Sequence, residues 1–122
     1  MLPLRIKEIY GDNYPYPIPM PQNYLQSGEI IHFGNHELKV IHTPGHSPGS
    51  VVFHCWEEKI AFTGDTLLSM NIGRTDFLGG DKEQMAESLE LIVHRLSGET
   101  IIYPGHGRKS TMAHEKACNP YL

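Results

Sequence analysis

The chain has 122 residues, of which 39% are hydrophobic and 20% are charged, values typical of a single soluble globular domain. The formal net charge of −4, without a cluster of lysine and arginine, argues against nucleic-acid binding. No apolar run approaches the length of a membrane span, and two cysteines are too few for a disulfide scaffold. We therefore expect a cytoplasmic protein, and its eight histidines hint at metal chemistry.

The first 24 residues are expected to form an arm or linker outside the core. Prolines stand at every second position from Pro15 to Pro21, which predicts an extended segment similar to polyproline. The domain itself is predicted over residues 25–122.

Three strands are predicted to form an antiparallel meander in the first part of this domain. In residues 36–43 and 50–56, successive side chains would point to opposite faces, as in a strand. Residues 59–63 form a third, shorter strand-like segment. A weaker strand is expected at residues 29–33. Residues 67–80, which are rich in glycine, are expected to form a loop.

A helix is predicted to follow, capped by Asp81 and with apolar side chains at helical spacing as far as Leu96. A fourth strand is expected at residues 100–103 and a closing helix at residues 111–118. The order strand, helix, strand implies a right-handed crossover to a parallel neighbour. The fold class is therefore α/β, with a mixed, mainly antiparallel sheet and two helices.

Three strands of this sheet should end at one edge, and each is followed by a polar residue next to a glycine: His46, Asp65 and His106. Sites in open α/β sheets gather outside the carboxyl ends of strands. Two imidazoles and one carboxylate suit zinc or non-haem iron, so we expect a metal site there. A Ser-His-Asp hydrolase is the competing interpretation, but Ser47 and Ser50 precede no predicted helix, where such a nucleophile would stand.

Over about residues 25–122 the sequence resembles the metallo-β-lactamase fold superfamily, and in particular its glyoxalase II-like hydrolases. The matching segments are Thr-Pro-Gly-His-Ser-Pro-Gly-Ser at 43–50, Phe-Thr-Gly-Asp-Thr-Leu at 62–67, Gly-Arg-Thr-Asp-Phe at 73–77, Tyr-Pro-Gly-His-Gly at 103–107, and the stretch from Glu115 to Pro120. The resemblance implies that the chain is the second half of an αββα sandwich.

The resemblance also implies a two-metal site, with zinc as the expected metal and iron as the alternative. His46 would bind one metal ion, His106 the second, and Asp65, as the catalytic carboxylate, would bridge the two. A metal-bound hydroxide would then attack a thioester or ester of a small-molecule substrate. Arg74 would lie near the rim of the site and contact the substrate; an ion pair with Asp76 that holds the loop is the alternative role.

The family signature His-x-His-x-Asp-His is absent from this sequence. The resemblance places that motif in the first half of the sandwich, so we expect a truncated domain in which each metal keeps two protein ligands. The predicted strands are apolar on both faces, and two helices can cover only one of them. The other face is expected to pair with a second copy, as in a homo-oligomer, or with a missing N-terminal half.

Three functions stay open from the sequence alone. The first is a glyoxalase II-like, metal-dependent hydrolase that is complete only with an N-terminal half. The second is an enzyme similar to persulfide dioxygenases, with a single iron. The third is a non-catalytic half-domain that oligomerises.

Overall fold

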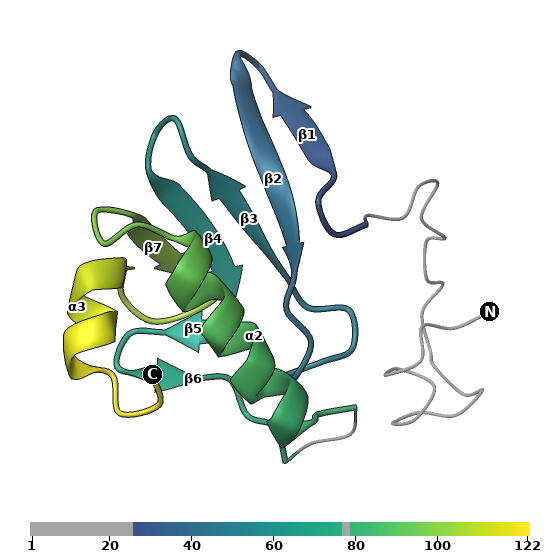
Figure 1. Cartoon of the computed structure of the whole chain (residues 1–122), viewed down its shortest axis with the longest axis vertical. Helices are drawn as coiled ribbons and strands as arrows, with labels where there is room; N and C mark the ends of the chain where they lie inside the picture. The colour runs from purple at the N-terminus through teal and green to yellow at the C-terminus, as the bar shows by residue number, and fades with distance from the viewer. Residues whose placement is uncertain (1–25, 77–78) are drawn as a thin grey trace.

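The computed structural model describes residues 26–76 and 79–122 (Figure 1). The predicted arm at residues 1–24, with its proline-rich segment, lies outside the described residues, so this division of the chain stays a prediction. The main sheet has six strands in the order β1-β2-β3-β4-β7-β8. The elements are β1 (Ile30–Phe33), β2 (His36–His42), β3 (Val51–Cys55), β4 (Ile60–Gly64), β5 (Leu67–Leu68), β6 (Asn71–Ile72), α2 (Lys82–Arg95), β7 (Ile101–Pro104), β8 (Ser110–Thr111) and α3 (Met112–Cys118).

The strand pairing confirms the predicted mixed, mainly antiparallel sheet with its two helices. Strands β1 to β4 form the antiparallel meander, and β7 joins β4 in parallel after the crossover through α2. The expectation of a plain loop at residues 67–80 was wrong, because β5 and β6 pair there as a short antiparallel hairpin. The edge strand β8 was also missed. Strands of two residues are too short to leave an alternating pattern in the sequence.

Both helices cover the same face of the sheet (Figure 1). Asp81 caps α2 as predicted, since its side chain accepts a hydrogen bond from the backbone N–H of Gln84 at 3.0 Å. Helix α2 then presents one apolar stripe to the sheet. The buried core consists of Ile41, Val52, Ala61, Leu67, Met85, Leu89, Ile92, Leu96, Ile102 and Met112.

The opposite face of the sheet carries aromatic side chains that neither α2 nor α3 covers. Phe53 pairs with Phe62 across β3 and β4, and Phe62 pairs with Tyr103 across β4 and β7, so the three side chains share this face. The rings of Phe62 and Tyr103 stack with centroids 5.7 Å apart, and Phe62 remains 45% exposed. We call this surface the open face. Its apolar character agrees with the prediction of strands that are apolar on both sides.

A buried carboxylate, that of Glu115 in α3, holds the β5–β6 hairpin in place. Its Oε1 accepts hydrogen bonds from the backbone N–H of Met70 at 2.8 Å and from Nδ2 of Asn119 at 2.9 Å, and its Oε2 accepts one from Ser110 at 2.6 Å. Burial raises the pKa of Glu115, but the hydrogen bonds from Ser110, Asn119 and Met70 outweigh it and leave the pKa below its ordinary value.

Replacing Glu115 with alanine should lower the free energy of unfolding by about 3 kcal/mol at pH 7, because buried donors lose their partner. Urea unfolding would measure the loss, with Glu87→Ala on the exposed side of α2 as the matched control. Since the folded-state pKa is lowered, this stabilisation is present above the pKa of the unfolded chain and disappears as the pH falls through the folded-state pKa. A difference between Glu115→Ala and the parent that stays constant into strong acid would contradict this assignment.

Candidate metal centre

The loop after β2 holds His46 against the start of α2. The backbone N–H of Asp81 donates to the carbonyl of Gly45 at 2.7 Å. A Cβ on Gly45 would stand 2.5 Å from Cα of Met85, so only glycine allows the loop to lie this close to the helix. The position of His46 is therefore tied to the helix that forms the crossover.

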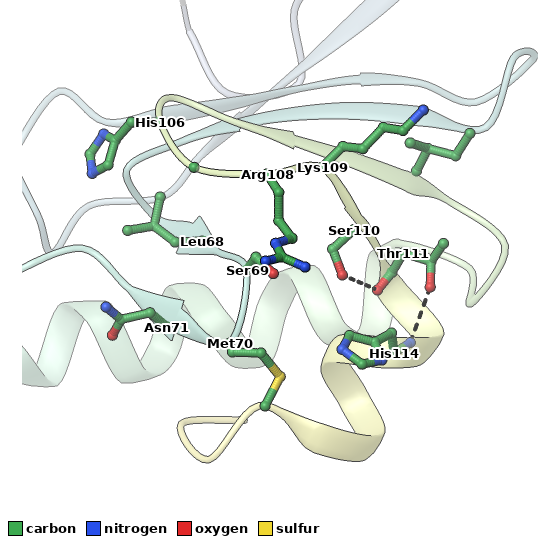
Figure 2. Close-up of a pocket in the computed structure, with 12 residues that line it drawn as sticks. Leu68, Ser69, Met70, Asn71, His106, Arg108, Lys109, Ser110, Thr111 and His114 are labelled. Carbon is green, nitrogen blue, oxygen red and sulfur yellow. Dashed lines mark hydrogen bonds between the residues drawn. The ribbon is translucent and has the colours of Figure 1, made fainter.

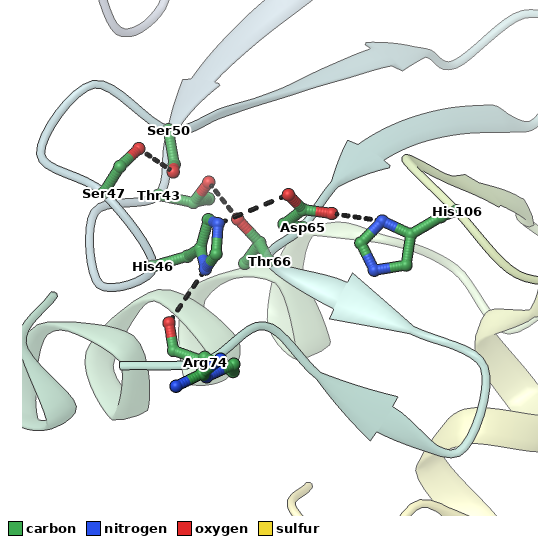
Figure 3. A network of polar contacts seen from close by, with 8 residues as sticks. All are labelled: Thr43, His46, Ser47, Ser50, Asp65, Thr66, Arg74 and His106. Atoms are coloured by element: carbon green, nitrogen blue, oxygen red, sulfur yellow. Dashed lines mark hydrogen bonds and ion pairs between the residues drawn. The ribbon is translucent and has the colours of Figure 1, made fainter. Parts of the chain in front are cut away.

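The imidazole of His46 is oriented by a backbone carbonyl. Its Nδ1 lies 2.8 Å from the carbonyl oxygen of Arg74 (Figure 3). A carbonyl can only accept, so Nδ1 carries the hydrogen and, in the neutral ring, the lone pair is on Nε2. Nε2 in turn lies 3.3 Å from Oδ2 of Asp65. This is the arrangement by which proteins usually orient a metal-binding histidine.

Asp65 lies between the two predicted histidine ligands, with one oxygen toward each (Figure 3). Oδ2 faces His46, and Oδ1 lies 2.9 Å from Nδ1 of His106. That contact has the distance of an ion pair but not the direction of a hydrogen bond, so Oδ1 is a buried oxygen without a hydrogen-bond partner. The structure thus brings together the three residues that the strand directions predicted.

These side chains fit a bound cation. A lone pair on Nε2 of His46 that faces a carboxylate oxygen at 3.3 Å is repulsive unless a proton or a metal ion stands between them. Imidazole nitrogen and carboxylate oxygen are both ligands of zinc and of iron. Within residues 26–76 and 79–122, however, no three His, Cys, Asp or Glu side chains are placed to hold a single metal ion. The three residues instead form two pairs that share Asp65.

Two glycines let the backbone pass close to these ligands. A Cβ on Gly73 would come within 1.9 Å of the backbone oxygen of Asp65 and 2.9 Å of Nδ1 of His46. A Cβ on Gly105 would stand 3.0 Å from Oδ1 of Asp65. Gly73 comes directly after β6, so the hairpin that sequence reasoning missed delivers both this glycine and the carbonyl of Arg74.

The side chain of Arg74 points away from this cluster and pairs with Asp76. Nε of Arg74 lies 3.0 Å from Oδ1 of Asp76, and both side chains are largely exposed. The hydrogen bond between them raises the pKa of Arg74 and lowers that of Asp76. This geometry favours the alternative role of a loop-holding pair, and substrate binding by Arg74 stays a prediction.

Other polar residues around the site stabilise its loops. Nε2 of His42 bonds the carbonyl of Pro48 at 2.8 Å, within the loop that carries His46. The hydroxyl of Thr66, the residue after Asp65, pairs with that of Thr43 at 3.0 Å, and both residues are buried.

The segment 45–49 also matches the letters Gly-x-Ser-x-Gly, although it runs into β3 and not into a helix. The hydroxyl of its serine, Ser47, lies 2.6 Å from that of Ser50. The context of a serine hydrolase nucleophile, a turn between a strand and a helix, is therefore absent from this described segment.

Residues 2–106 match the family model of the metallo-beta-lactamase superfamily. The chain belongs to this superfamily. It is 42% identical to "Hydroxyacylglutathione hydrolase GloC" of Haemophilus influenzae over 81% of this chain and 47% of GloC. It is 38% identical to "Persulfide dioxygenase ETHE1, mitochondrial" of Bos taurus over 81% of this chain and 41% of that protein.

A solved structure, that of TTHA1623 in a di-iron-bound form, superposes with a TM-score of 0.77 at 38% identity, covering 85% of this chain and 50% of TTHA1623. The chain thus spans about half the length of the curated relatives it matches. The resemblance to glyoxalase II-like proteins is confirmed, and the partial fold agrees with it. No helix in the described part of the chain is long and apolar enough to cross a membrane.

Substituting Gly73 with alanine should lower the free energy of unfolding by about 1–3 kcal/mol, because the new methyl group collides with the backbone oxygen of Asp65. Gly49→Ala is the matched control, since a Cβ there meets nothing within 4 Å and the change should stay within about 0.5 kcal/mol. Thermal and urea unfolding would measure both variants. Equal stability of the two variants would show that Gly73 does not need to approach Asp65 closely.

Proposed function

We propose that His46, Asp65 and His106 are ligands of a two-metal centre that hydrolyses a thioester or ester of a small molecule. The observation that carries this proposal is the Asp65 carboxylate, which directs one oxygen toward each imidazole. The similarity to a hydroxyacylglutathione hydrolase supports a glyoxalase II-like reaction. Zinc suits these ligands, and the di-iron form of TTHA1623 makes iron the alternative.

The chain's own residues would contribute orientation and charge to this reaction. A bound metal ion would lower the pKa of a water molecule and polarise the substrate carbonyl. His46 would present Nε2 because the carbonyl of Arg74 fixes the hydrogen on Nδ1. Asp65 would keep both oxygens for the centre, with its charge balancing part of the metal charge.

A second candidate is a reaction like that of persulfide dioxygenases, with one iron ion. The 38% identity to bovine ETHE1 favours it, and the sequence Gly-Arg-Thr-Asp at residues 73–76 is compatible with it. A non-catalytic half-domain is the third candidate, because each metal ion would have only two ligands from this chain: one histidine and the shared Asp65. Metal analysis, thioester hydrolysis and oxygen uptake distinguish the three.

His46→Ala should remove bound metal and activity, with a loss beyond the roughly 10- to 100-fold that an outer-sphere partner usually costs. The chain, combined with the first half of Haemophilus influenzae GloC as a separate polypeptide, would be loaded with zinc or iron(II). It would then be assayed for metal content, for hydrolysis of a hydroxyacylglutathione, and for oxygen uptake with a persulfide. His32→Ala on the exposed strand β1 is the control and should leave all three unchanged.

Each outcome selects one candidate. Hydrolysis that depends on His46 supports the hydrolase, and oxygen uptake that depends on His46 supports the dioxygenase. If this chain, combined with the first half of Haemophilus influenzae GloC, binds neither metal and turns over neither substrate, it is the non-catalytic half-domain, and the proposed function is then wrong.

We also propose that the open face is covered by a polypeptide layer equivalent to the first half of the family fold. Three observations favour this occupant over a second copy. The chain spans 47% of GloC, the His-x-His-x-Asp-His signature is absent from its sequence, and the centre has too few ligands for two metals. An exposed aromatic surface around Phe62 is the kind of patch that marks an interface.

The first half of Haemophilus influenzae GloC, supplied as a separate polypeptide, should form a one-to-one complex with this chain in sedimentation experiments. Phe62→Glu should weaken the complex about tenfold or more, because it places a charge in the apolar contact. Trp56→Glu is the matched control, since Trp56 is similarly exposed but lines a pocket with Ile41 and with Arg95 of α2, on the side of the sheet that packs on the helices. A stable dimer of this chain that excludes the GloC segment, or a monomer that ignores it, would contradict the proposal.

A further inference from the structure

A cleft of about 950 Å³ lies between the β5–β6 hairpin and the segment that leads from His106 into α3 (Figure 2). His106 stands at one end of the cleft, so the cleft adjoins the proposed metal centre. Its lining residues are Leu68, Ser69, Met70, Asn71, Ile101, His106, Gly107, Arg108, Lys109, Ser110, Thr111 and His114.

The charge of this cleft is opposite to that of the whole chain. The chain carries a formal net charge of −4, yet the lining includes Arg108, Lys109 and two histidines and no aspartate or glutamate. Among the residues that the structure describes, neither Arg108 nor Lys109 takes part in an ion pair. A concave surface lined by cations and without acidic side chains attracts anions.

The two neighbouring cations differ in direction. In Figure 2 the guanidinium of Arg108 extends into the cleft toward Ser69, with the ring of His114 on the same side. The side chain of Lys109 extends the other way, out of the cleft. Arg108 is thus the cation that a molecule in the cleft would meet, and Lys109 contributes only general positive charge.

The walls of the cleft are fixed before any ligand arrives. Glu115 lies buried behind them and connects Met70 of the hairpin to Ser110 of β8. Both of its oxygens accept hydrogen bonds, and none of the ion pairs in the described part of the chain joins this carboxylate to Arg108. Asn119 adds a bond of 3.1 Å to the carbonyl of Asn71. A preformed cavity loses little conformational freedom when it binds.

We propose that this cleft binds the carboxylate of a small organic anion, with Arg108 as its main contact. A guanidinium presents two parallel N–H groups to a carboxylate, a geometry that an ammonium cannot offer. The hydroxyl of Ser69 and the ring of His114 line the same space. Its role in catalysis depends on the proposed function, because a molecule held at Arg108 would reach toward His106. The binding itself requires no metal.

The test is a calorimetric and NMR titration of the whole chain in the presence of a chelator, with S-methylglutathione as the probe. Arg108→Ala should weaken binding about tenfold or more, and Lys109→Ala, which removes the same charge one residue away, should change it less than about twofold. The diethyl ester of the probe lacks free carboxylates and should bind the parent chain about tenfold more weakly than the acid does. It should bind the parent chain and Arg108→Ala equally well.

Four results would overturn the assignment. The first is equal weakening by Arg108→Ala and Lys109→Ala, which indicates unspecific attraction. The second is an ester that binds as well as the acid, and the third is a probe that does not bind at all. The fourth is tighter binding of inorganic phosphate than of the probe. The titration contains no metal, so its result does not depend on whether the chain takes part in the proposed hydrolysis. If the probe does not bind, the proposed hydrolysis is still judged by the metal and activity assays on His46→Ala.

Discussion

The arrangement at the sheet edge depends on one carboxylate placed between two imidazoles. Asp65 sits where β4 ends, and the parallel pairing of β4 with β7 brings His106 to the same edge. His46 stands in the loop between the antiparallel strands β2 and β3, which lies at this same edge of the sheet. The lone pair on Nε2 of His46 faces this carboxylate, a contact that is favourable only with a proton or a metal ion between the two atoms. The surrounding glycines make room for the backbone that supports these side chains.

Much of this edge could be predicted from the sequence, because strand direction follows from the order of elements and short turns. His46, Asp65 and His106 were placed together on that reasoning, and the cap at Asp81 was read from its neighbours. The hairpin β5–β6 could not be predicted, since two-residue strands leave no periodicity. The bond from His46 to the carbonyl of Arg74 also has no sequence signal, because every residue carries a carbonyl.

The two faces of the main sheet differ in what covers them. One packs on α2 and α3 to form the core, and the other presents Phe53, Phe62 and Tyr103 without a helix from the described part of the chain. Alternation along a strand fixes which side chains belong together, but it cannot say what covers them. The family relationship, and a match to about half of each curated relative, supply the reason to look for a further layer.

The anchoring of the β5–β6 hairpin by Glu115 has a consequence for the order of assembly. The orientation of His46 rests on the carbonyl of Arg74, the residue after Gly73, and the hairpin before it is held by a side chain from α3, forty-five residues beyond Met70. Contacts so far apart in sequence form late, because their loop-closure entropy must be met first. The direction of the His46 imidazole is therefore coupled, through this hairpin, to the docking of α3 on the rest of the domain.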